Sequence, residues 1–513
     1  MKKAVFLLAM VLGAMNAGAV TFQPDTLYSR WIINSCLYHF QANTRPAGFA
    51  QYDCNGQLLR PSESNRGFDY VPGLVAKATL EAADFYKSEA FARRWLYAIR
   101  AYGHTYAYGK TADGQKGVPD HGGSLDDLNA TKLYFMLREL SLPGAPFADA
   151  QTVSDCDNAL RRAQQALGDH NDRYSISAET STAYAGNTSF AGGWWHKASY
   201  QNEMWCDGQY TGPALLAQML PAGYPLPGKT TDECWDIIAA QLRMTWGRLW
   251  NPSTRLLYHA FSATPAMDAY WADQQQGPHY GVSAEYWGRA TGWYFLALVD
   301  ILAEMPEDNP NRAELRQMLN LLADGIAARQ DAQTGLWRQL LQYGPTVLTE
   351  GDNYLESSCS AIFIASYLKG MRLGLYDTDY YPLAERAYRG FVENFINDNN
   401  NDNHNGDGNV IVLTHNCASA GLSDTRKGDA EYYLNQANDT KRTDTYTEGK
   451  VLGAFILAAT EYERAVADGR LGNTSRLNAR KARRCCHKQL RCGHVEIRTE
   501  NGVFSATGQK LAQ

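Results

Sequence analysis

Apolar residues recur at helical spacing in twelve segments of the chain, spread between Leu27 and Ala465. Their intervals of three and four residues place them on one face of an α-helix. Gly, Pro, Asn and Asp separate the segments, and strand-like alternation is scarce. The pattern predicts helices over Leu27–Phe40, Asp69–Tyr86, Glu89–Tyr106, Asp126–Leu140, Ser154–Leu167, Asp207–Pro221, Thr231–Leu249, Glu285–Met305, Asn311–Arg329, Leu355–Gly374, Asp379–Ile396 and Gly449–Ala465.

Twelve consecutive helices pack most economically as six hairpins in a double ring, the (α/α)6 barrel. Small residues at close spacing, such as Ala76, Ala78 and Ala82, or Ala361 and Ala365, let helices approach each other along long contacts. We therefore predict an all-α fold with this six-hairpin architecture. An irregular all-α bundle is the alternative, and helix counting by itself does not separate the two.

Polar and aromatic clusters stand where several of the predicted helices begin. In a double ring the inner helices converge on one opening, and their N-terminal ends and preceding loops line it. The clusters therefore predict a binding pocket at that opening. They are Asp69-Tyr70, Asp126-Asp127-Leu128-Asn129, Met204-Trp205-Cys206-Asp207, Glu285-Tyr286-Trp287-Gly288-Arg289 and Asn353-Tyr354-Leu355-Glu356.

The stretch Gly192–Pro213, GGWWHKASYQNEMWCDGQYTGP, is the densest of these regions. Aromatic rings stack on the apolar faces of sugars, and a carboxyl group removed from water has its pKa raised and holds a proton near neutral pH. The stretch therefore indicates a sugar-processing pocket. Asp207 is a better placed acid than Glu203, because it lies between Trp205 and the predicted helix. The alternative is a Trp-rich core loop with solvated carboxylates.

The two ends of the chain differ from its body. Residues 1–19 have the positive, apolar and small-residue parts of a secretory signal peptide, so we expect export to the periplasm or beyond the cell. No other stretch approaches the roughly 18 to 20 apolar residues that a membrane span requires. We predict one catalytic domain over residues 20–470, and a poorly ordered basic tail over residues 471–513 with a strand-like end.

The formal net charge of -6 is unevenly distributed. Residues 471–513 carry nine Lys and Arg side chains against two Glu, a balance of +7, so residues 1–470 sum to -13. An acidic body argues against nucleic acid as a partner. It does not exclude an acidic sugar, because a few basic side chains set the field inside one pocket.

Neither the ten cysteines nor the Asn/Asp-rich run at residues 398–409 has the pattern of a metal site. No Cys-x-x-Cys pair is followed by a second one, so zinc is not expected. A calcium-loop register that starts at Asn401 puts Val412 where a bidentate Glu is required, which favours a solvated loop. We expect neither a metal nor another cofactor.

Several ordered motifs resemble the unsaturated rhamnogalacturonyl hydrolases of glycoside hydrolase family 105. The resemblance extends from about Trp31 to Glu463, and the motifs together are more specific than any one of them. It implies the (α/α)6 barrel that the helix pattern also favours. The matching motifs are Gly192–Pro213, Leu256–His259, Glu285–Trp293, Asn353–Ser358, and Gly453–Phe455 with Glu461.

The resemblance implies a substrate and a reaction. The family acts on pectin fragments left by lyases, which carry a 4,5-unsaturated uronic acid at the non-reducing end. Hydration of this vinyl ether requires one proton shuttle, rather than the acid and nucleophile of retaining glycosidases. Asp207 matches the family's catalytic Asp. Asp126 matches its second acidic residue, and Asp127 takes that place if the alignment slips by one residue.

Further residues are candidates for substrate binding. His259 matches an active-site His of the family, and His196 and Lys197 match its His-Lys pair beside the pocket. Arg289 and Trp293 are four residues apart and share a helix face, where a guanidinium group and a ring suit a planar unsaturated sugar and its carboxylate. A satisfied structural residue is the alternative for each histidine. The predicted substrate-binding residues are His259, Arg289, Trp293, Trp205, His196, Lys197 and Tyr70.

Three other functions stay open on the sequence. Glucuronyl hydrolases that act on other unsaturated uronides share the fold and the chemistry. An inverting (α/α)6 glycosidase would use Asp126 and Asp207 as acid and base, about 6.5 to 9.5 Å apart. A catalytically silent sugar-binding protein would keep the aromatic lining without turnover. We expect a monomer whose partner is an unsaturated acidic oligosaccharide.

Overall fold

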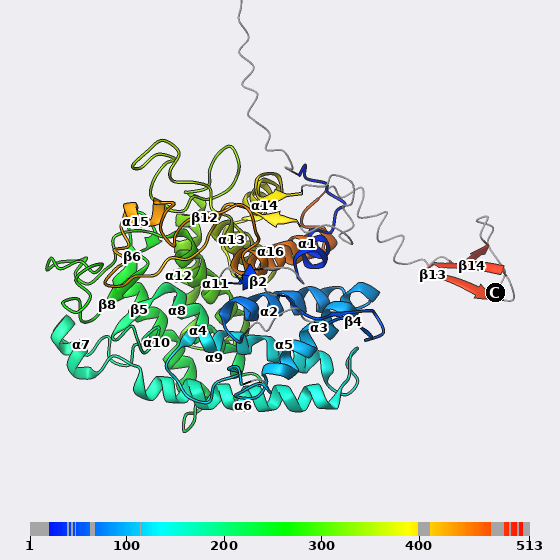
Figure 1. The fold of residues 1–513 in the computed structure, drawn as a ribbon, viewed down its shortest axis with the longest axis horizontal. Coiled ribbons are helices and arrows are strands. Elements are labelled where there is room, and N and C mark those ends of the chain that lie inside the picture. Colours follow the sequence, from blue (N-terminus) through cyan, green and yellow to red (C-terminus); the bar gives the residue numbers. More distant parts are fainter. Residues whose placement is uncertain are drawn as a thin grey trace, which may run out of the picture. The chain divides into compact units, whose positions relative to one another are not determined.

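The computed structural model describes residues 20–37, 41–42, 45–46, 48–61, 67–112, 114–398, 411–472, 487–491, 494–499 and 502–505. The chain divides into two compact units, residues 1–461 and 462–513. The first unit is built mainly of helices (Figure 1), which confirms the all-α prediction. The predicted signal peptide at residues 1–19 and nearly all of the Asn/Asp-rich run lie outside the described residues.

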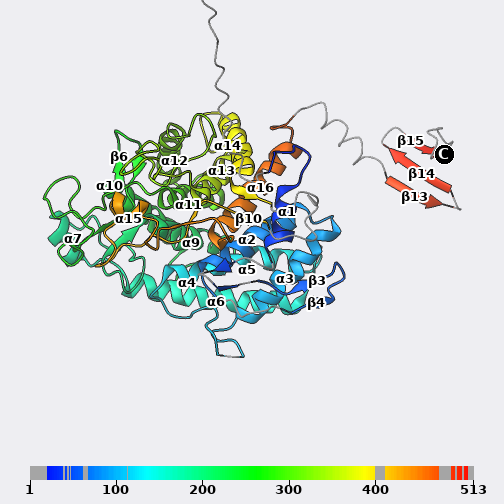
Figure 2. The ribbon, with the colours of Figure 1, turned by 45° about the horizontal axis from the view of Figure 1, so that its top comes forward.

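Each of the twelve predicted segments contains a helix, and the helices alternate between an inner and an outer layer (Figures 1 and 2). Inner helices are buried along most of their length, whereas outer helices bury one face. The inner helices are α2 (Tyr70–Phe85), α4 (Leu125–Asn129) with α5 (Leu133–Ser141), α8 (Cys206–Thr211) with α9 (Pro213–Met219), α11 (Gly288–Glu304), α13 (Ser357–Arg372) and the first part of α16 (Gly449–Ala467). The outer helices are α1 (Tyr28–Cys36), α3 (Ala90–Tyr106), α6 (Ala150–Arg173), α10 (Thr231–Leu249), α12 (Arg312–Ala327) and α14 (Tyr381–Phe395).

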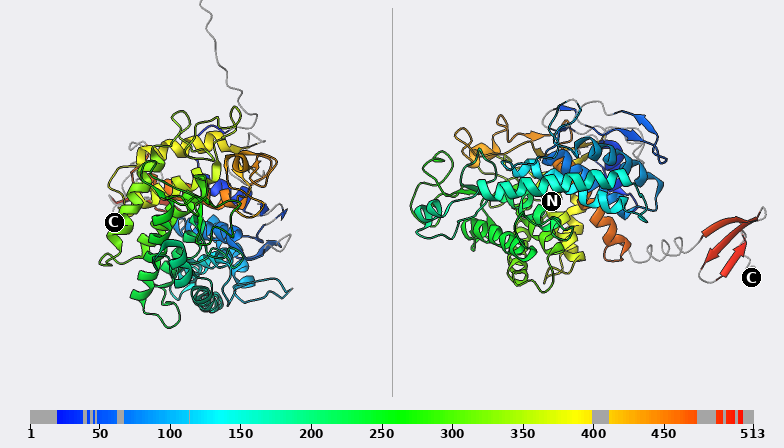
Figure 3. Two further views of the ribbon diagram at one scale, coloured as in Figure 1. Left: turned by 90° about the vertical axis from the view of Figure 1, so that its left-hand side faces the viewer. Right: turned by 90° about the horizontal axis from the view of Figure 1, so that it is seen from below.

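Glycines set the spacing between neighbouring inner helices. A Cβ atom at Gly73 in α2 would overlap the backbone of Ala130, in the 3-10 turn Ala130–Lys132 between α4 and α5. A Cβ atom at Gly453 in α16 would lie 2.6 Å from Leu74 Cγ in α2. The absence of a side chain therefore lets three consecutive inner helices of the ring approach closely. The outer helix α6 runs along the underside of this unit (Figure 3).

The structure differs from the helix prediction at four places. The helix predicted over Asp207–Pro221 is broken into α8 and α9 at Gly212-Pro213, because proline has no N–H to donate and is favoured in a first helical turn. The helix predicted over Asp126–Leu140 is likewise interrupted by a 3-10 turn. Two short helices were not predicted, α7 (Ala178–Ala185) and α15 (Ala430–Leu434).

Short antiparallel strand pairs join the helices of the first unit, and the second unit contains a three-stranded antiparallel sheet in the order β13-β14-β15. The latter strands fall in the segment whose end was predicted to be strand-like. The strands are β1 (Gln41–Ala42), β2 (Arg45–Pro46), β3 (Gln51–Tyr52), β4 (Leu58–Arg60), β5 (Glu203–Trp205), β6 (Trp250–Asn251), β7 (Leu256–Leu257), β8 (Ala260–Ser262), β9 (Ile396–Asn397), β10 (Val412–Leu413), β11 (Asn416–Cys417), β12 (Arg442–Thr443), β13 (His487–Arg491), β14 (His494–Thr499) and β15 (Gly502–Ser505).

A buried group of charges lies between the inner helices. Asp300 in α11 pairs with Lys369 in α13 at 2.6 Å, and Lys77 in α2 pairs with Glu81 at 2.5 Å. Burial would raise the pKa of Asp300, but the lysines around it lower that pKa to about 2. The charges compensate one another, as buried ions must, and they connect three inner helices.

Candidate active site

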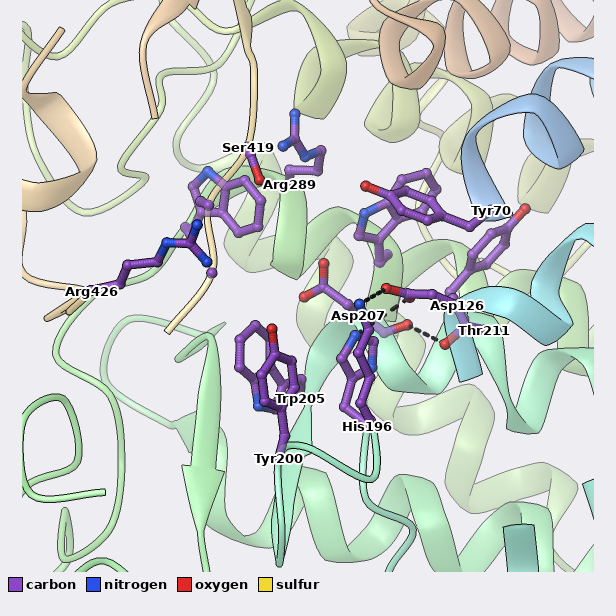
Figure 4. Close-up of a pocket in the computed structure, with 16 residues that line it drawn as sticks. Tyr70, Asp126, His196, Tyr200, Trp205, Asp207, Thr211, Arg289, Ser419 and Arg426 are labelled. Atoms are coloured by element: carbon purple, nitrogen blue, oxygen red, sulfur yellow. Dashed lines mark hydrogen bonds and ion pairs between the residues drawn. The ribbon is translucent and has the colours of Figure 1, made fainter. Parts of the chain in front are cut away.

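A pocket opens where the inner helices begin (Figure 4). Its empty space is about 710 Å³, including solvent at the mouth. Tyr70 is the first residue of α2, and Asp126, Asp207 and Arg289 are the second residues of α4, α8 and α11. The inner helices therefore direct their N-terminal ends at one opening, as predicted. The lining residues are Tyr70, Asp126, His196, Lys197, Tyr200, Trp205, Asp207, Tyr210, Thr211, Trp287, Arg289, Trp293, Ser419, Ala420, Gly421 and Arg426.

Asp207 is brought beside His259 by the pairing of β5 with β8. Next to this pair, the Cys206 N–H donates a hydrogen bond to the His259 carbonyl oxygen at 3.0 Å. Asp207 Oδ2 then lies 3.2 Å from His259 Nε2, although the two atoms are not aligned as a hydrogen bond. On the other side of the ring, His259 Nδ1 lies 2.6 Å from the Tyr433 hydroxyl. The result is a chain of three polar groups that ends at the pocket.

His259 is the one predicted site residue that does not line the pocket. It is fully buried, with its ring centroid 4.9 Å from those of Trp205 and Trp287. The prediction that His259 contacts the substrate is therefore not supported by the geometry. Because it lies behind Asp207, His259 is placed to orient that carboxyl group.

Asp126 is held by a backbone bridge between Ser124 and Lys197. The Ser124 hydroxyl caps α4, and Lys197 Nζ lies 2.6 Å from Asp126 Oδ2, while His196 Nε2 lies 3.4 Å from Oδ1. Burial alone would raise the pKa of Asp126, but His196 and Lys197 outweigh it and hold the pKa well below its usual range. Asp126 is therefore anionic near neutral pH. The adjacent Asp127 is not among the lining residues.

One wall of the pocket is a stack of flat side chains. The Tyr200 and Trp205 rings are parallel within 3°, with centroids 4.9 Å apart, and the His196 ring lies 5.3 Å from Trp205. The Trp205 indole N–H donates to Glu203 Oε2 at 2.7 Å. Burial, with Asp268 nearby, raises the pKa of Glu203 to about 8. Glu203 is thus a neutral support of the wall at pH 7, a role that the sequence did not indicate.

Arg289 is nearly enclosed, with 2% of its surface exposed. Its Nη1 donates to the Cys417 carbonyl oxygen at 2.6 Å and to the Ser358 hydroxyl at 3.2 Å. Glu356 caps α13 and also accepts the Cys417 N–H at 2.9 Å, which fixes this backbone against Arg289. Trp293 lies one turn further along α11 and lines the pocket with it, as predicted.

The predictions missed a loop and several aromatic residues of the pocket. Ser419, Ala420, Gly421 and Arg426 come from the segment between β11 and α15, which has no hydrophobic period to mark it. Leu422 of this loop packs in one cluster with Trp205. A signal existed for Tyr200, Tyr210 and Thr211, which stand within Gly192–Pro213, and for Trp287, which stands in the predicted cluster Glu285–Arg289. The complete set of missed lining residues is Tyr200, Tyr210, Thr211, Trp287, Ser419, Ala420, Gly421 and Arg426.

Across the part of the chain that the structure describes, no three His, Cys, Asp or Glu side chains are grouped to hold a metal ion. The pocket instead combines an anionic Asp126, a second carboxyl group at Asp207, basic groups and an aromatic wall. Such an arrangement can bind a sugar and transfer a proton to it.

Comparison with known proteins places the chain in a family. The family model described as Glycosyl Hydrolase Family 88 matches residues 49–466. The chain belongs to this family. Over 167 residues the family 88 chain is 34% identical to the 24.9 kDa protein in picA locus of Rhizobium radiobacter, covering 32% of this chain and 67% of that protein. It is 29% identical over 125 residues to the unsaturated rhamnogalacturonyl hydrolase YesR of Bacillus subtilis (strain 168), covering 24% of this chain and 30% of YesR.

Solved structures agree with this assignment. A family 105 glycoside hydrolase from C. acetobutylicum ATCC 824 has a TM-score of 0.59 and 25% identity, covering 78% of this chain and 94% of that one. The unsaturated glucuronyl hydrolase of Bacillus sp. GL1 shares the fold, with a TM-score of 0.50 and 14% identity, covering 85% of this chain and 96% of that one. The resemblance to family 105, the (α/α)6 barrel and the prediction of a glycoside hydrolase are confirmed.

None of the helices in the described residues is long and apolar enough to cross a membrane.

Proposed function

We propose that this glycoside hydrolase hydrates the C4=C5 bond of a 4,5-unsaturated galacturonyl residue at the non-reducing end of rhamnogalacturonan oligosaccharides. The observation that carries the proposal is the difference between the contacts of the two pocket carboxyl groups, Asp126 and Asp207. Lys197 Nζ lies 2.6 Å from Asp126 Oδ2, whereas Asp207 Oδ2 has His259 Nε2 at 3.2 Å and no hydrogen-bond partner among the described residues. The pocket thus offers one carboxyl group for proton transfer, which is what hydration of a vinyl ether requires.

Asp207 acts in this scheme as the proton shuttle. Its carboxyl proton goes to C4 of the unsaturated ring, and the π electrons of the C4=C5 bond form the new C4–H bond. The positive charge that results is shared between C5 and the ring oxygen. Water then adds at C5 and returns a proton to Asp207. The C5–O5 bond of this hemiketal then breaks to give a ketone at C5 and a hemiacetal at C1. The hemiacetal collapses to an aldehyde and releases the next sugar as an alcohol, so the hydrated residue leaves as an open-chain keto acid without direct displacement at the anomeric carbon.

Asp126 serves as a fixed anion rather than as a second acid or base. A general base works best with a pKa near the working pH, and the pKa of Asp126 is held far below that by His196 and Lys197. This disfavours the inverting mechanism, in which Asp126 and Asp207 would act as acid and base. An anion at Asp126 is suited to orienting sugar hydroxyl groups and to stabilising the positive charge that develops on the ring.

The assay follows the ultraviolet absorbance of the conjugated enol in lyase-generated oligosaccharides. Loss of absorbance is expected with unsaturated rhamnogalacturonan fragments, and a parallel set of unsaturated glucuronides tests the alternative uronide. Cleavage of saturated oligosaccharides alone would reject hydration and favour the inverting mechanism. Binding without turnover of any substrate would indicate a silent sugar-binding protein.

The variant Asp207→Asn keeps the shape of the side chain but has no transferable proton. We expect turnover to fall by at least roughly 100-fold, the effect typical of losing a general acid, while the circular dichroism spectrum is unchanged. A near-normal rate in this variant would remove Asp207 from the mechanism. The relative from Bacillus subtilis, named for the same activity, supports the choice of rhamnogalacturonan as substrate.

Export and a monomeric state are also part of the proposal. The signal-peptide pattern of residues 1–19 supports export to the periplasm or the medium. Sequencing the N-terminus of protein recovered from those fractions tests it, with a start near Val20 as the expected result. Light scattering of the purified protein tests the monomer, and a mass twice that of the chain would reject it.

A further inference from the structure

The loop between β11 and α15 presents an arginine, Arg426, to the pocket. Ser423 and Arg426 exchange backbone hydrogen bonds at 3.2 Å in both directions, which makes a tight turn. Arg426 Nε lies 2.8 Å from Asp439 Oδ2, and the Tyr432 hydroxyl donates to Asp439 Oδ1 at 3.1 Å. The turn and the ion pair therefore fix the guanidinium group from one side. In Figure 4, Arg426 and Asp126 lie on opposite sides of Asp207.

Arg426 differs from the other two cations on the pocket wall. Lys197 lies 2.6 Å from Asp126, and Arg289 is 2% exposed. The Arg426 side chain is 41% exposed, and among the described residues it has no hydrogen bond or ion pair other than that to Asp439. Because Asp439 lies against Nε, the two terminal nitrogens are left to form the planar fork that a carboxylate fits.

The carboxylates of the pocket favour a further cation where an acidic substrate binds. Asp126 is an anion, and Asp207 becomes one when it has given up its proton. A third carboxylate, carried in by the substrate, would be repelled by both. A cation on the far side of Asp207 from Asp126 offsets this repulsion where the substrate enters.

We propose that Arg426 binds a carboxylate of the oligosaccharide through its terminal guanidinium nitrogens and so makes an acidic sugar a condition of tight binding. The inference rests on the proposed function, and it identifies Arg426 as the residue that selects acidic oligosaccharides. The carboxylate has two possible sources, the unsaturated ring itself and the next uronic acid in the aglycone. Leu422 of the same loop packs in one cluster with Trp205. In either case, binding of the carboxylate at Arg426 would therefore be coupled to stacking of the sugar on the aromatic wall.

The test measures binding by calorimetry on an Asp207→Asn background, so that turnover does not enter. The ligands are an unsaturated galacturonyl-rhamnose disaccharide, the tetrasaccharide that repeats these sugars, and their methyl esters. Arg426→Gln is expected to weaken binding of a free acid by roughly 10- to 100-fold, the range for a charge-assisted pair, and Arg426→Lys by less. Binding of the esters should hardly change.

Lys427→Gln is the matched control, because it removes a positive charge at the neighbouring position. The Lys427 side chain pairs with Asp429 at 2.9 Å and is not among the residues that line the pocket. If Arg426→Gln weakens binding of both the disaccharide and the tetrasaccharide acids, the carboxylate belongs to the unsaturated ring. If it weakens binding of the tetrasaccharide alone, the carboxylate belongs to the aglycone. Both results support the proposal. Equal affinities in Arg426→Gln and Lys427→Gln would overturn it. Absence of turnover in the wild-type enzyme would instead reject the proposed function.

Discussion

Replacing Glu203 by glutamine tests whether a buried neutral carboxyl group supports the aromatic wall. Glu203 is 4% exposed and accepts the Trp205 indole N–H, and its pKa is raised from 4.5 to about 8, first by burial and then by Asp268. An amide has the shape of the protonated acid, so Glu203→Gln is expected to fold normally at pH 5. The difference from the wild-type protein should appear only as the pH rises.

The direction and the size of this change in the free energy of unfolding follow from the linkage between folding and protonation. A carboxyl group whose pKa is raised in the folded state contributes stability that is fully present below the unfolded value of 4.5 and is lost as the pH rises through about 8. At about 1.36 kcal/mol per pH unit, this loss amounts to roughly 5 kcal/mol at most. The glutamine variant does not titrate, so its stability relative to wild type should increase across this window.

Urea denaturation at pH 5 and at pH 8.5 measures the effect as a difference in the free energy of unfolding. The control is Glu307→Gln, because the Glu307 side chain is 87% exposed and pairs with Arg312 on the surface. That variant should differ from wild type by less than about 1 kcal/mol at either pH. A Glu203→Gln difference that is the same at both pH values would refute the assignment of Glu203 as a neutral group at pH 7.

Three further predictions concern the site and the packing of the ring. Lys197→Met removes a cation that lowers the pKa of Asp126, so that pKa should rise and the acidic limb of the kcat/KM profile should move to higher pH; an unmoved limb would contradict the ion pair as its cause. Tyr433→Phe removes the group 2.6 Å from His259 Nδ1 and should lower kcat roughly tenfold with little change in KM, whereas an equal change in KM would place Tyr433 in binding. Gly73→Ala should lower the free energy of unfolding by about 1 to 3 kcal/mol, because its Cβ would overlap Ala130. The control is Gly247→Ala in α10, where a Cβ would have no atoms within 4 Å, and it should raise that free energy by about 1 kcal/mol at most. Equal effects of the two variants on the urea midpoint would argue against tight packing at Gly73.

The helices could be predicted because their signal is local. The apolar period of Thr231–Leu249 gives the bounds of α10 as the structure has them, and a Thr-Glu capping box fixes its start. The prediction over Asp207–Pro221 failed at Gly212-Pro213, where the periodicity continues through a break in the backbone. Helix α15 was missed because Ala430–Leu434 is too short to show a period.

The candidate acids could also be found from the sequence, but their states could not. Asp126 and Asp207 stand out as carboxylates at predicted helix starts next to aromatic residues. Whether each carries a charge depends on partners that other segments supply, such as Lys197 beside Asp126 and His259 behind Asp207. The Leu-Asp-x-x-Asn pattern favours Asp126 over Asp127 without excluding the latter, and of the two only Asp126 lines the pocket.

The sequence by itself determined the (α/α)6 class, the aromatic stretch with Asp207, and the resemblance to family 105, because periodicity and ordered motifs are properties of the chain alone. The tertiary structure decided that His259 lies behind Asp207, that Glu203 is a neutral support under Trp205, and that Arg426 joins the pocket. The places of His259 and Arg426 depend on contacts between segments far apart in the chain, whose separation carries no signal. The Glu203–Trp205 hydrogen bond is local, but the burial and the nearby Asp268 that keep Glu203 neutral come from the tertiary structure.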